Sequence, residues 1–275
     1  MIIFKAKTQE AYCLKILAEL LANNLKSGCF EIDDNGIVLI MMDHNRKVLI
    51  NLNLSSINFS TYKFNSPEKL YIGINLNHFH KMLKSIKKKD NIELSINSEE
   101  PNDLYIHVIP KDNTRITTSS IKIQNIQTLD ITMPVGYGKP IIIPSGEYSK
   151  MLKDLGSLGG NIKGNIIKIQ SKNRQIEFAC NSAGILKRKV KFGEADDSCA
   201  DDELKEEDEY SEEFSSDLLC RITKLAGLSS QIQIYPGKPL LLCSNVGNLG
   251  KIHIYIKSKS EIDVQNLESI ESDED

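Results

Sequence analysis

Lysine side chains recur through this sequence at a nearly constant interval. Lys15, Lys84, Lys153 and Lys224 are separated by 69, 69 and 71 residues. A lysine ammonium group binds phosphate oxygens as a point charge and reads no base. If equivalent lysines share one surface, their spacing predicts a partner that carries many phosphates.

Further basic residues stand three or four positions from these lysines. The stretch KMLK occurs twice, at residues 81–84 and 150–153. On a helix, residues three, four or seven positions apart share one face, so these pairs form cationic stripes opposite apolar side chains. The candidate contact residues are Lys15, Lys81, Lys84, Lys88, Lys150, Lys153, Arg221 and Lys224.

Four amphipathic helices must position these cations. Apolar residues recur with a helical period over residues 9–25, 76–88, 145–157 and 216–226. Asn75 or Asn77 can cap the second helix, Pro144 and Ser145 open the third, and Gly227 can close the fourth. Because each helix carries one of the equally spaced lysines, the chain contains a weak fourfold repeat.

Short runs of strand character separate the helices. Examples are GIVLIMM, KVLINLNL, QIEFAC and GKIHIYIK, with turn signals such as DDNG and PGKP between runs. Strands outnumber helices about fourfold and do not alternate with them. This pattern predicts an α+β fold in which helices cover one face of antiparallel sheets.

Charge is distributed unevenly along the chain. Residues 194–213 carry a net charge of −11, and residues 260–275 carry −7. Without these two segments the net charge of −3 becomes +15. A core this basic favours a polyanion as partner. The alternative is that lysines are distributed evenly over the whole surface. Only the positions of the lysines in the fold can decide between a polyanion-binding surface and this even distribution.

No arrangement of residues in the sequence indicates catalysis. His78 and His80 diverge on the proposed helix, the six cysteines form no C-x-x-C pair, and the glycines of 156–165 lack phosphate-loop spacing. We therefore expect no catalytic residue, no metal, no cofactor and no disulfide. The sequence also lacks a signal peptide and a membrane-spanning apolar stretch, so we expect no membrane partner.

The basic helix faces contain few groups that could recognise bases. They lack aromatic residues for stacking and an Asn, Gln and Arg cluster for reading the major groove. The predicted target is therefore the backbone of duplex DNA, bound without sequence preference and with strong salt dependence.

Several segments resemble one known family. DNGIVLIMMDHNRKVLINLNL (34–54), YIGINLNHFHKMLKSI (71–86), IPSGEYSKMLKDLGSLG (143–159) and ITKLAGLSS (222–230) are similar to eukaryotic-type DNA sliding clamps, the proliferating cell nuclear antigen family. The resemblance extends from about residue 4 to 259. It is compatible with a cellular source or with a large DNA virus.

The resemblance implies a ring of three identical subunits with helices inside and sheets outside. Each subunit would have two similar domains, 1–121 and 139–259, joined by a connector over 122–138. Residues 194–213 would form an acidic loop and 260–275 an acidic tail. Edge strands near residues 113–121 and 176–183 would pair between subunits.

The resemblance also implies a function and partners. The ring would encircle duplex DNA and tether DNA polymerase and other replication and repair proteins, and a clamp loader would be a further partner. It would act in the nucleus, or at a cytoplasmic replication site if the source is viral. A partner peptide would insert apolar and aromatic side chains into a pocket. By residue match, that pocket is formed by Met42, Leu49, Ile131, Met133, Pro239, His253 and Ile256.

Two alternatives to this hypothesis remain open. One is a monomeric or dimeric polymerase processivity subunit of the same fold, which holds DNA by charge without closing a ring. The other is a phosphoryl-transfer enzyme or nuclease that acts on DNA. The mass in solution separates the first alternative from the ring, and metal-dependent turnover would identify the second.

Overall fold

The computed structural model of the 275-residue chain consists of two compact units. It describes residues 1–112, 115–127, 130–158, 165–182, 186–193 and 209–272. Unit 1 comprises Met1–Thr132, Gly227–Ser229 and Ser244–Ile254. Unit 2 comprises Met133–Ala226, Ser230–Cys243 and Tyr255–Asp275. Each unit contains antiparallel strands and helices, so the α+β prediction is confirmed.

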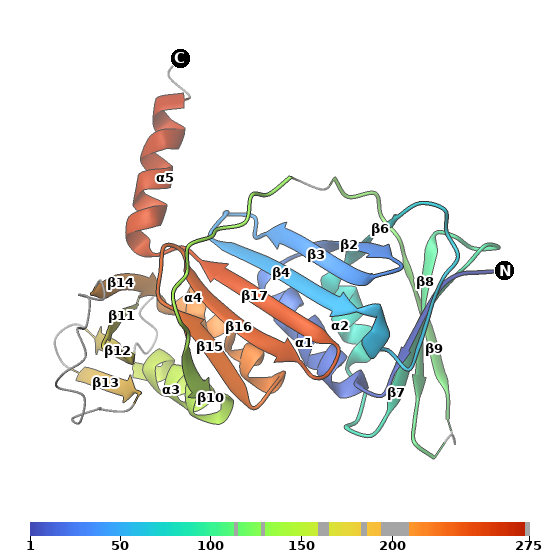
Figure 1. Ribbon diagram of the computed structural model, residues 1–275, viewed down its shortest axis with the longest axis horizontal. Coiled ribbons are helices and arrows are strands. Elements are labelled where there is room, and N and C mark those ends of the chain that lie inside the picture. Colours follow the sequence, from blue (N-terminus) through green and yellow to red (C-terminus); the bar gives the residue numbers. More distant parts are fainter. Residues whose placement is uncertain (113–114, 128–129, 159–164, 183–185, 194–208, 273–275) are drawn as a thin grey trace. The chain divides into compact units, whose positions relative to one another are not determined.

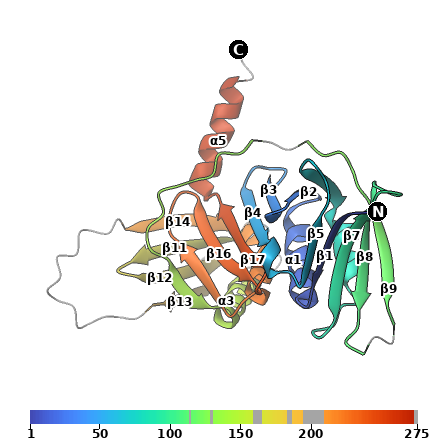
Figure 2. The ribbon, with the colours of Figure 1, turned by 45° about the vertical axis from the view of Figure 1, so that its right-hand side comes forward.

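Two groups of antiparallel strands form the framework of unit 1. The first has the order β5-β1-β7-β8-β9, and the second has the order β4-β3-β2-β6. Figure 2 shows β9 along the outer edge of the first sheet. The strands are β1 (Ile2–Thr8), β2 (Ser27–Asp33), β3 (Gly36–Met42), β4 (Val48–Ser55), β5 (Thr61–Phe64), β6 (Leu70–Asn75), β7 (Asn91–Asn97), β8 (Asp103–Ile109) and β9 (Thr117–Lys122).

Two helices cover one face of the β2–β4 strands in unit 1 (Figure 1). They are α1 (Ala11–Asn24) and α2 (Leu76–Leu83), and a short 3-10 helix, η1 (Ser56–Asn58), follows β4. The side chain of Asn75 caps α2 by accepting a 3.0 Å hydrogen bond from the His78 amide. The helices bury leucine side chains against the sheet, and Leu20, Leu76 and Leu83 are completely buried.

Unit 2 is also built from two strand groups. One has the order β13-β12-β11-β14, and in the other β15 pairs with both β10 and β16. The strands are β10 (Ile141–Pro144), β11 (Ile166–Lys172), β12 (Gln175–Ser182), β13 (Leu186–Phe192), β14 (Tyr210–Ser215), β15 (Gln231–Tyr235), β16 (Leu240–Val246) and β17 (Gly250–Ile256). Strands β16 and β17 each contain residues of both units.

The helices of unit 2 are α3 (Ser145–Leu158), α4 (Ser216–Arg221), the 3-10 helix η2 (Thr223–Gly227) and α5 (Lys259–Ser272). Tyr148 and Leu152 of α3 are buried, and Tyr148 packs edge-on against Phe178 of β12. Helix α4 ends before Ile222, whose side chain is fully buried, and the chain continues as η2.

Helix α5 replaces part of the expected acidic tail and has a defined beginning. The Ser258 amide donates to the Glu261 carboxylate at 2.8 Å, and the Glu261 amide donates to Ser258 Oγ at 3.3 Å, which together form a capping box. Glu212 of β14 anchors the first turn by binding Ser260 Oγ at 2.7 Å and Lys238 Nζ at 2.6 Å. Burial raises the pKa of Glu212, but these hydrogen bonds outweigh burial and lower it overall.

Most predicted elements are confirmed, but several boundaries and one edge strand differ. The four helices lie at 11–24, 76–83, 145–158 and 216–221, and the fourth continues as η2. The edge expected at 176–183 is wrong because β12 is paired on both sides, which leaves β13 as the edge strand. The acidic loop does not extend to residue 213, because 210–213 belong to β14. Residues 194–208 of that predicted loop lie outside the described residues.

Two other expectations concern membrane spans and domain boundaries. Among the described residues, no helix is both long enough and apolar enough to cross a membrane. The domain boundaries at residues 121, 138 and 259 stay predictions.

Replacing the helix cap should loosen α5. Ser258→Ala removes the acceptor for the Glu261 amide, which should cost about 1 kcal/mol of local stability. Amide exchange over residues 259–267 should then become roughly fivefold faster, as measured by hydrogen–deuterium exchange. Ser85→Ala, at an exposed serine of unit 1, is the control. Unchanged exchange in α5 of Ser258→Ala would contradict the capping role.

Candidate nucleic-acid interface

Lys15 of α1 reaches the segment that follows α2. Its Nζ donates a 3.0 Å hydrogen bond to the carbonyl oxygen of Ile86 and lies 5.6 Å from the centre of the Tyr12 ring. The neighbouring Leu14 is buried, so the lysine leaves the helix at the margin of its apolar face. The half-buried ammonium group therefore joins two elements of unit 1 in addition to supplying charge.

Lys88 approaches the same aromatic ring. Its Nζ lies 5.9 Å from the centre of the Tyr12 ring, within the range of a cation–π interaction. Two ammonium groups beside one ring repel each other, and a bound anion would relieve that repulsion. This group of Tyr12, Lys15 and Lys88 is thus suited to contact a phosphate.

Helix α2 separates its charges cleanly from its apolar residues. Phe79 and Leu83 are buried, while Lys81 and Lys84 are exposed. Helix α2 ends at Leu83, so Lys84 is its C-cap residue. Lys88, which the sequence predicted to lie within a helix over 76–88, is beyond the end of α2. Lysine near a helix C-terminus is stabilised by the helix dipole.

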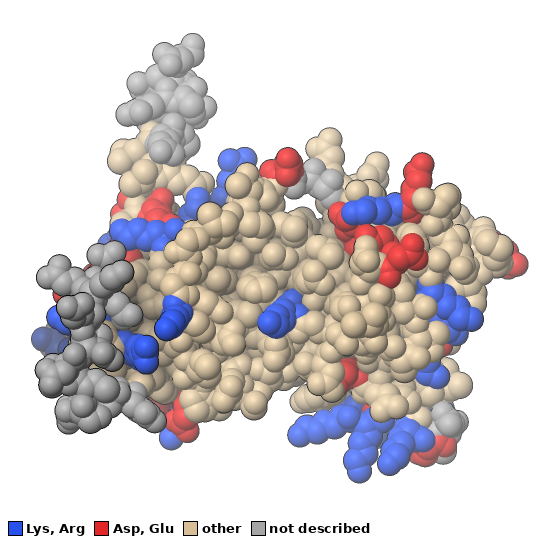
Figure 3. Space-filling view, viewed as in Figure 1, with Lys and Arg blue, Asp and Glu red and all other residues tan. Residues whose placement is uncertain are grey.

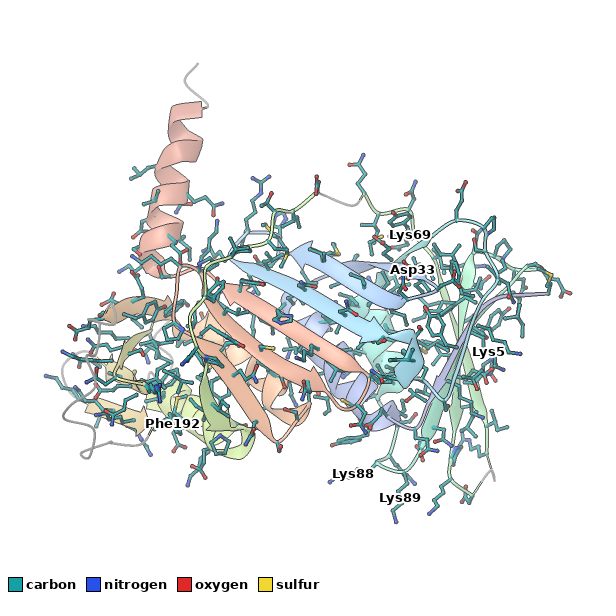
Figure 4. The ribbon with its side chains drawn as sticks, viewed as in Figure 1. Lys5, Asp33, Lys69, Lys88, Lys89 and Phe192 are labelled. Atoms are coloured by element: carbon teal, nitrogen blue, oxygen red, sulfur yellow. The ribbon has the colours of Figure 1, made fainter. Side chains whose placement is uncertain are left out.

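The turn after α2 adds two lysines that the sequence analysis did not include. Lys87 and Lys89 are exposed, and the buried Asp90 carboxylate accepts a 2.8 Å hydrogen bond from the Lys87 amide, which closes the turn. Figure 3 shows a group of basic side chains at the lower margin of the view, where Figure 4 places Lys88 and Lys89. The run KKKD was the available signal, but helical spacing alone excluded Lys87 and Lys89.

Unit 2 presents its predicted cations in the same way. Lys150 and Lys153 of α3 are exposed, and the adjacent Met151 and Leu152 are buried. Lys224 of η2 is exposed beside the fully buried Leu225, whereas Arg221 of α4 is half-buried. The contribution of all eight predicted residues to DNA binding stays a prediction.

Four of the predicted pocket residues belong to unit 1. Met42 and Leu49 are direct partners in the β3–β4 register, with Met42 half-buried and Leu49 buried. Ile131 and His253 are half-buried. Burial and the neighbouring Lys251 lower the pKa of His253, so its imidazole is neutral at pH 7 and can act as an apolar contact surface.

The other predicted pocket residues belong to unit 2. Met133 and Pro239 are half-buried, but Ile256 is fully buried. In the described conformation Ile256 can therefore support such a surface only from beneath. The pocket assignment stays a prediction.

Three tyrosines that the pocket prediction omitted gather next to Pro239. The Tyr137 hydroxyl donates to the Pro239 carbonyl at 2.7 Å, and its ring lies 6.2 Å from that of Tyr235 and 6.0 Å from that of Tyr255. Burial and nearby acidic groups raise the pKa of Tyr137, so its hydroxyl remains protonated. The residues are distant in sequence, which is why periodicity did not group them.

Comparison with known proteins shows which family this chain resembles. The family model "Proliferating cell nuclear antigen, N-terminal domain" matches residues 3–131. This part of the chain is therefore similar to that domain. The matched residues include α1, α2 and the basic residues of unit 1.

Relatives and a solved structure extend the similarity beyond the N-terminal domain. The chain is 23% identical to the proliferating cell nuclear antigen of Chaetomium thermophilum, over 93% of this chain and 97% of that protein. It is 22% identical to "Probable DNA polymerase sliding clamp 1" of Paramecium bursaria Chlorella virus 1, over 93% and 96% of the two chains. The structure of the Entamoeba histolytica antigen matches with a TM-score of 0.79 at 18% identity, covering 94% of this chain and all of the other. The fold is therefore that of the proliferating cell nuclear antigen.

Lys15 and Lys84 should differ in their contribution to stability. Lys15→Met keeps the aliphatic stem but removes the hydrogen bond to Ile86, and should lower the free energy of unfolding by about 1 kcal/mol. Lys84→Met changes an exposed side chain and should alter it by less than about 0.5 kcal/mol. Urea denaturation measures both variants. Equal effects would contradict the linking role of Lys15.

Proposed function

We propose that this chain is a DNA sliding clamp, a ring that encircles duplex DNA and tethers DNA polymerase to its template. One observation carries the proposal. In a fold similar to the proliferating cell nuclear antigen, each of three repeats places an exposed lysine next to a fully buried leucine, in the pairs Leu83–Lys84, Leu152–Lys153 and Leu225–Lys224. The packing of each buried leucine against its sheet therefore leaves the neighbouring lysine on the solvent-exposed side of the chain.

The clamp would bind DNA weakly and without sequence preference. Lysine contacts to phosphates are electrostatic, so they weaken with salt and allow the protein to move along the duplex. The proposed contacts are Lys15, Lys81, Lys84, Lys88, Lys150, Lys153, Arg221 and Lys224. The role is one of tethering, so we propose no catalytic residue and no cofactor.

Two edge strands support closure of a homotrimer. Among the described residues, β9 and β13 are the last strands of their sheets, so each presents backbone groups on its outer side. Pairing β9 of one subunit with β13 of the next would satisfy these groups. Three such contacts in a head-to-tail arrangement would close a ring.

The proposed partners are DNA polymerase, a clamp loader and other proteins that carry a clamp-binding peptide. The relatives named as DNA polymerase sliding clamps support this choice. We propose that the peptide contacts the predicted pocket residues together with the tyrosine group around Tyr137. The site of action would be the nucleus, or a cytoplasmic replication site for a viral protein.

Reversing three helix charges should impair processive synthesis. The triple variant Lys84→Glu, Lys153→Glu and Lys224→Glu should reduce polymerase stimulation on long primed templates by about tenfold or more, because phosphates would then face carboxylates. The matched control reverses Lys63, Lys168 and Lys172, which are also exposed but lie on strands. Normal stimulation by the helix variant, or equal loss in the control, would contradict the assignment of these faces to DNA.

The mass in solution should be about three times the chain mass of 30.9 kDa. Multi-angle light scattering coupled to size exclusion, at micromolar concentration, measures it. A species of one or two chains would favour the alternative of a processivity subunit that does not close into a ring.

A further inference from the structure

Gly73 of β6 is covered directly by another part of unit 1. A Cβ atom at this position would lie 2.2 Å from the carbonyl oxygen of Gln124 and 2.7 Å from Ile126 Cγ1. The first contact is with backbone, so no side-chain rotation could relieve it. Any residue other than glycine at position 73 would therefore push the 124–126 segment away from β6.

The covering segment is the beginning of the predicted connector. After β9 the Ile123 amide donates to the Asn102 carbonyl at 2.8 Å, and the Gln124 amide donates to the Gly73 carbonyl at 2.7 Å. Gly73 and Gln124 thus form an isolated antiparallel bridge. Figure 1 shows the chain leaving β9 and passing beside β6.

This contact fixes the beginning of the predicted connector. Two backbone hydrogen bonds and the Ile126 side chain hold residues 123–126 on unit 1. Each residue that is ordered in advance lowers the entropy lost when a ligand later binds. Ile131, one of the predicted pocket residues, lies five residues beyond Ile126.

We propose that Gly73 is a positioning residue for partner-peptide binding. Because Gly73 has no side chain, the connector can pack against β6, and this contact fixes the point from which the segment carrying Ile131 extends. This inference rests on the proposed function, because it assumes that the pocket binds a partner peptide. The same contact also occupies part of the outer edge of β6, where an added strand could otherwise pair.

Two variants and one control test this role. Gly73→Ala introduces the clash, whereas Gln124→Pro removes the amide that donates to Gly73 and leaves β6 unchanged. Gly146→Ala in α3 is the matched control, because a Cβ there meets nothing within 4 Å and its backbone needs no positive φ. Using Gln124→Pro keeps the test decisive if Gly73→Ala does not fold.

The experiment measures connector protection and peptide affinity in the full-length protein. Hydrogen–deuterium exchange follows residues 123–127, and fluorescence anisotropy follows a synthetic clamp-binding peptide with apolar and aromatic anchors. Both variants should expose residues 123–127 to faster exchange and weaken binding of the peptide about tenfold, with the mass unchanged. Gly146→Ala should match the wild type in the exchange of residues 123–127 and in peptide affinity.

Three results would overturn the inference. Unchanged exchange in both variants would show that Gly73 does not hold the connector. Faster exchange with unchanged peptide affinity would show that the contact of the connector with Gly73 does not position the segment that carries Ile131. If the wild-type protein binds no such peptide, both the proposed partner site and the positioning role of Gly73 are wrong. Faster exchange of residues 123–127 in Gly73→Ala would then still show that Gly73 holds the connector, which separates this result from the first.

Discussion

The burial of leucine next to exposed lysine is the constraint on which the rest of the structure depends. Leu83 and Leu152 are completely buried, while Lys84 and Lys153, the next residues in sequence, are exposed. A fully buried leucine contributes about 1.5–3 kcal/mol by leaving water, whereas an exposed lysine contributes little to folding. The sheet therefore determines how each helix is rotated, and the lysine position follows from that rotation.

Because of this constraint, the residues that stabilise the core differ from the lysines that are proposed to bind DNA. Because lysines on the helix faces are not needed for the core, their charges can serve a polyanion at little cost to stability. Lys15 is the exception, since its hydrogen bond to Ile86 and its contact with Tyr12 tie it to unit 1. A weak phosphate contact is sufficient for a protein that is retained by topology, and it permits movement that tight binding would prevent.

Helical period and charge spacing were enough to predict the four helices, because each has a buried apolar stripe, and α2 also has a capping signal in Asn75. They were not enough where long-range pairing decides the structure. β12 has strong strand character, but its position inside the sheet depends on β13, which is basic and less apolar. Residues 210–213 of β14 were assigned to an acidic loop because Glu212 and Glu213 continue the acidic run. The buried Phe214 that follows them is a single apolar residue and does not by itself indicate a strand.

The candidate site likewise combines features that local sequence predicts with features that depend on long-range contacts. The exposed lysines of α2 and α3 follow from periodicity, whereas the grouping of Tyr137 with Tyr235 and Tyr255 requires segments far apart in sequence to meet. Helix α5 was read as a tail because its acidic residues resemble a solvated segment, although Ser258 and Glu261 have capping-box spacing. The contact of the connector with Gly73 leaves no pattern in sequence, since glycine is also common in turns.

Retention on circular DNA tests the central claim most directly. The protein is loaded onto a nicked circular plasmid with a clamp loader, and the complex is passed through a sizing column at high salt before and after one restriction cut. A closed ring should remain with the circle and be lost when the DNA becomes linear, because only a topological link depends on free ends. Equal retention on circular and linear DNA would show that charge alone holds the protein, and would contradict the account.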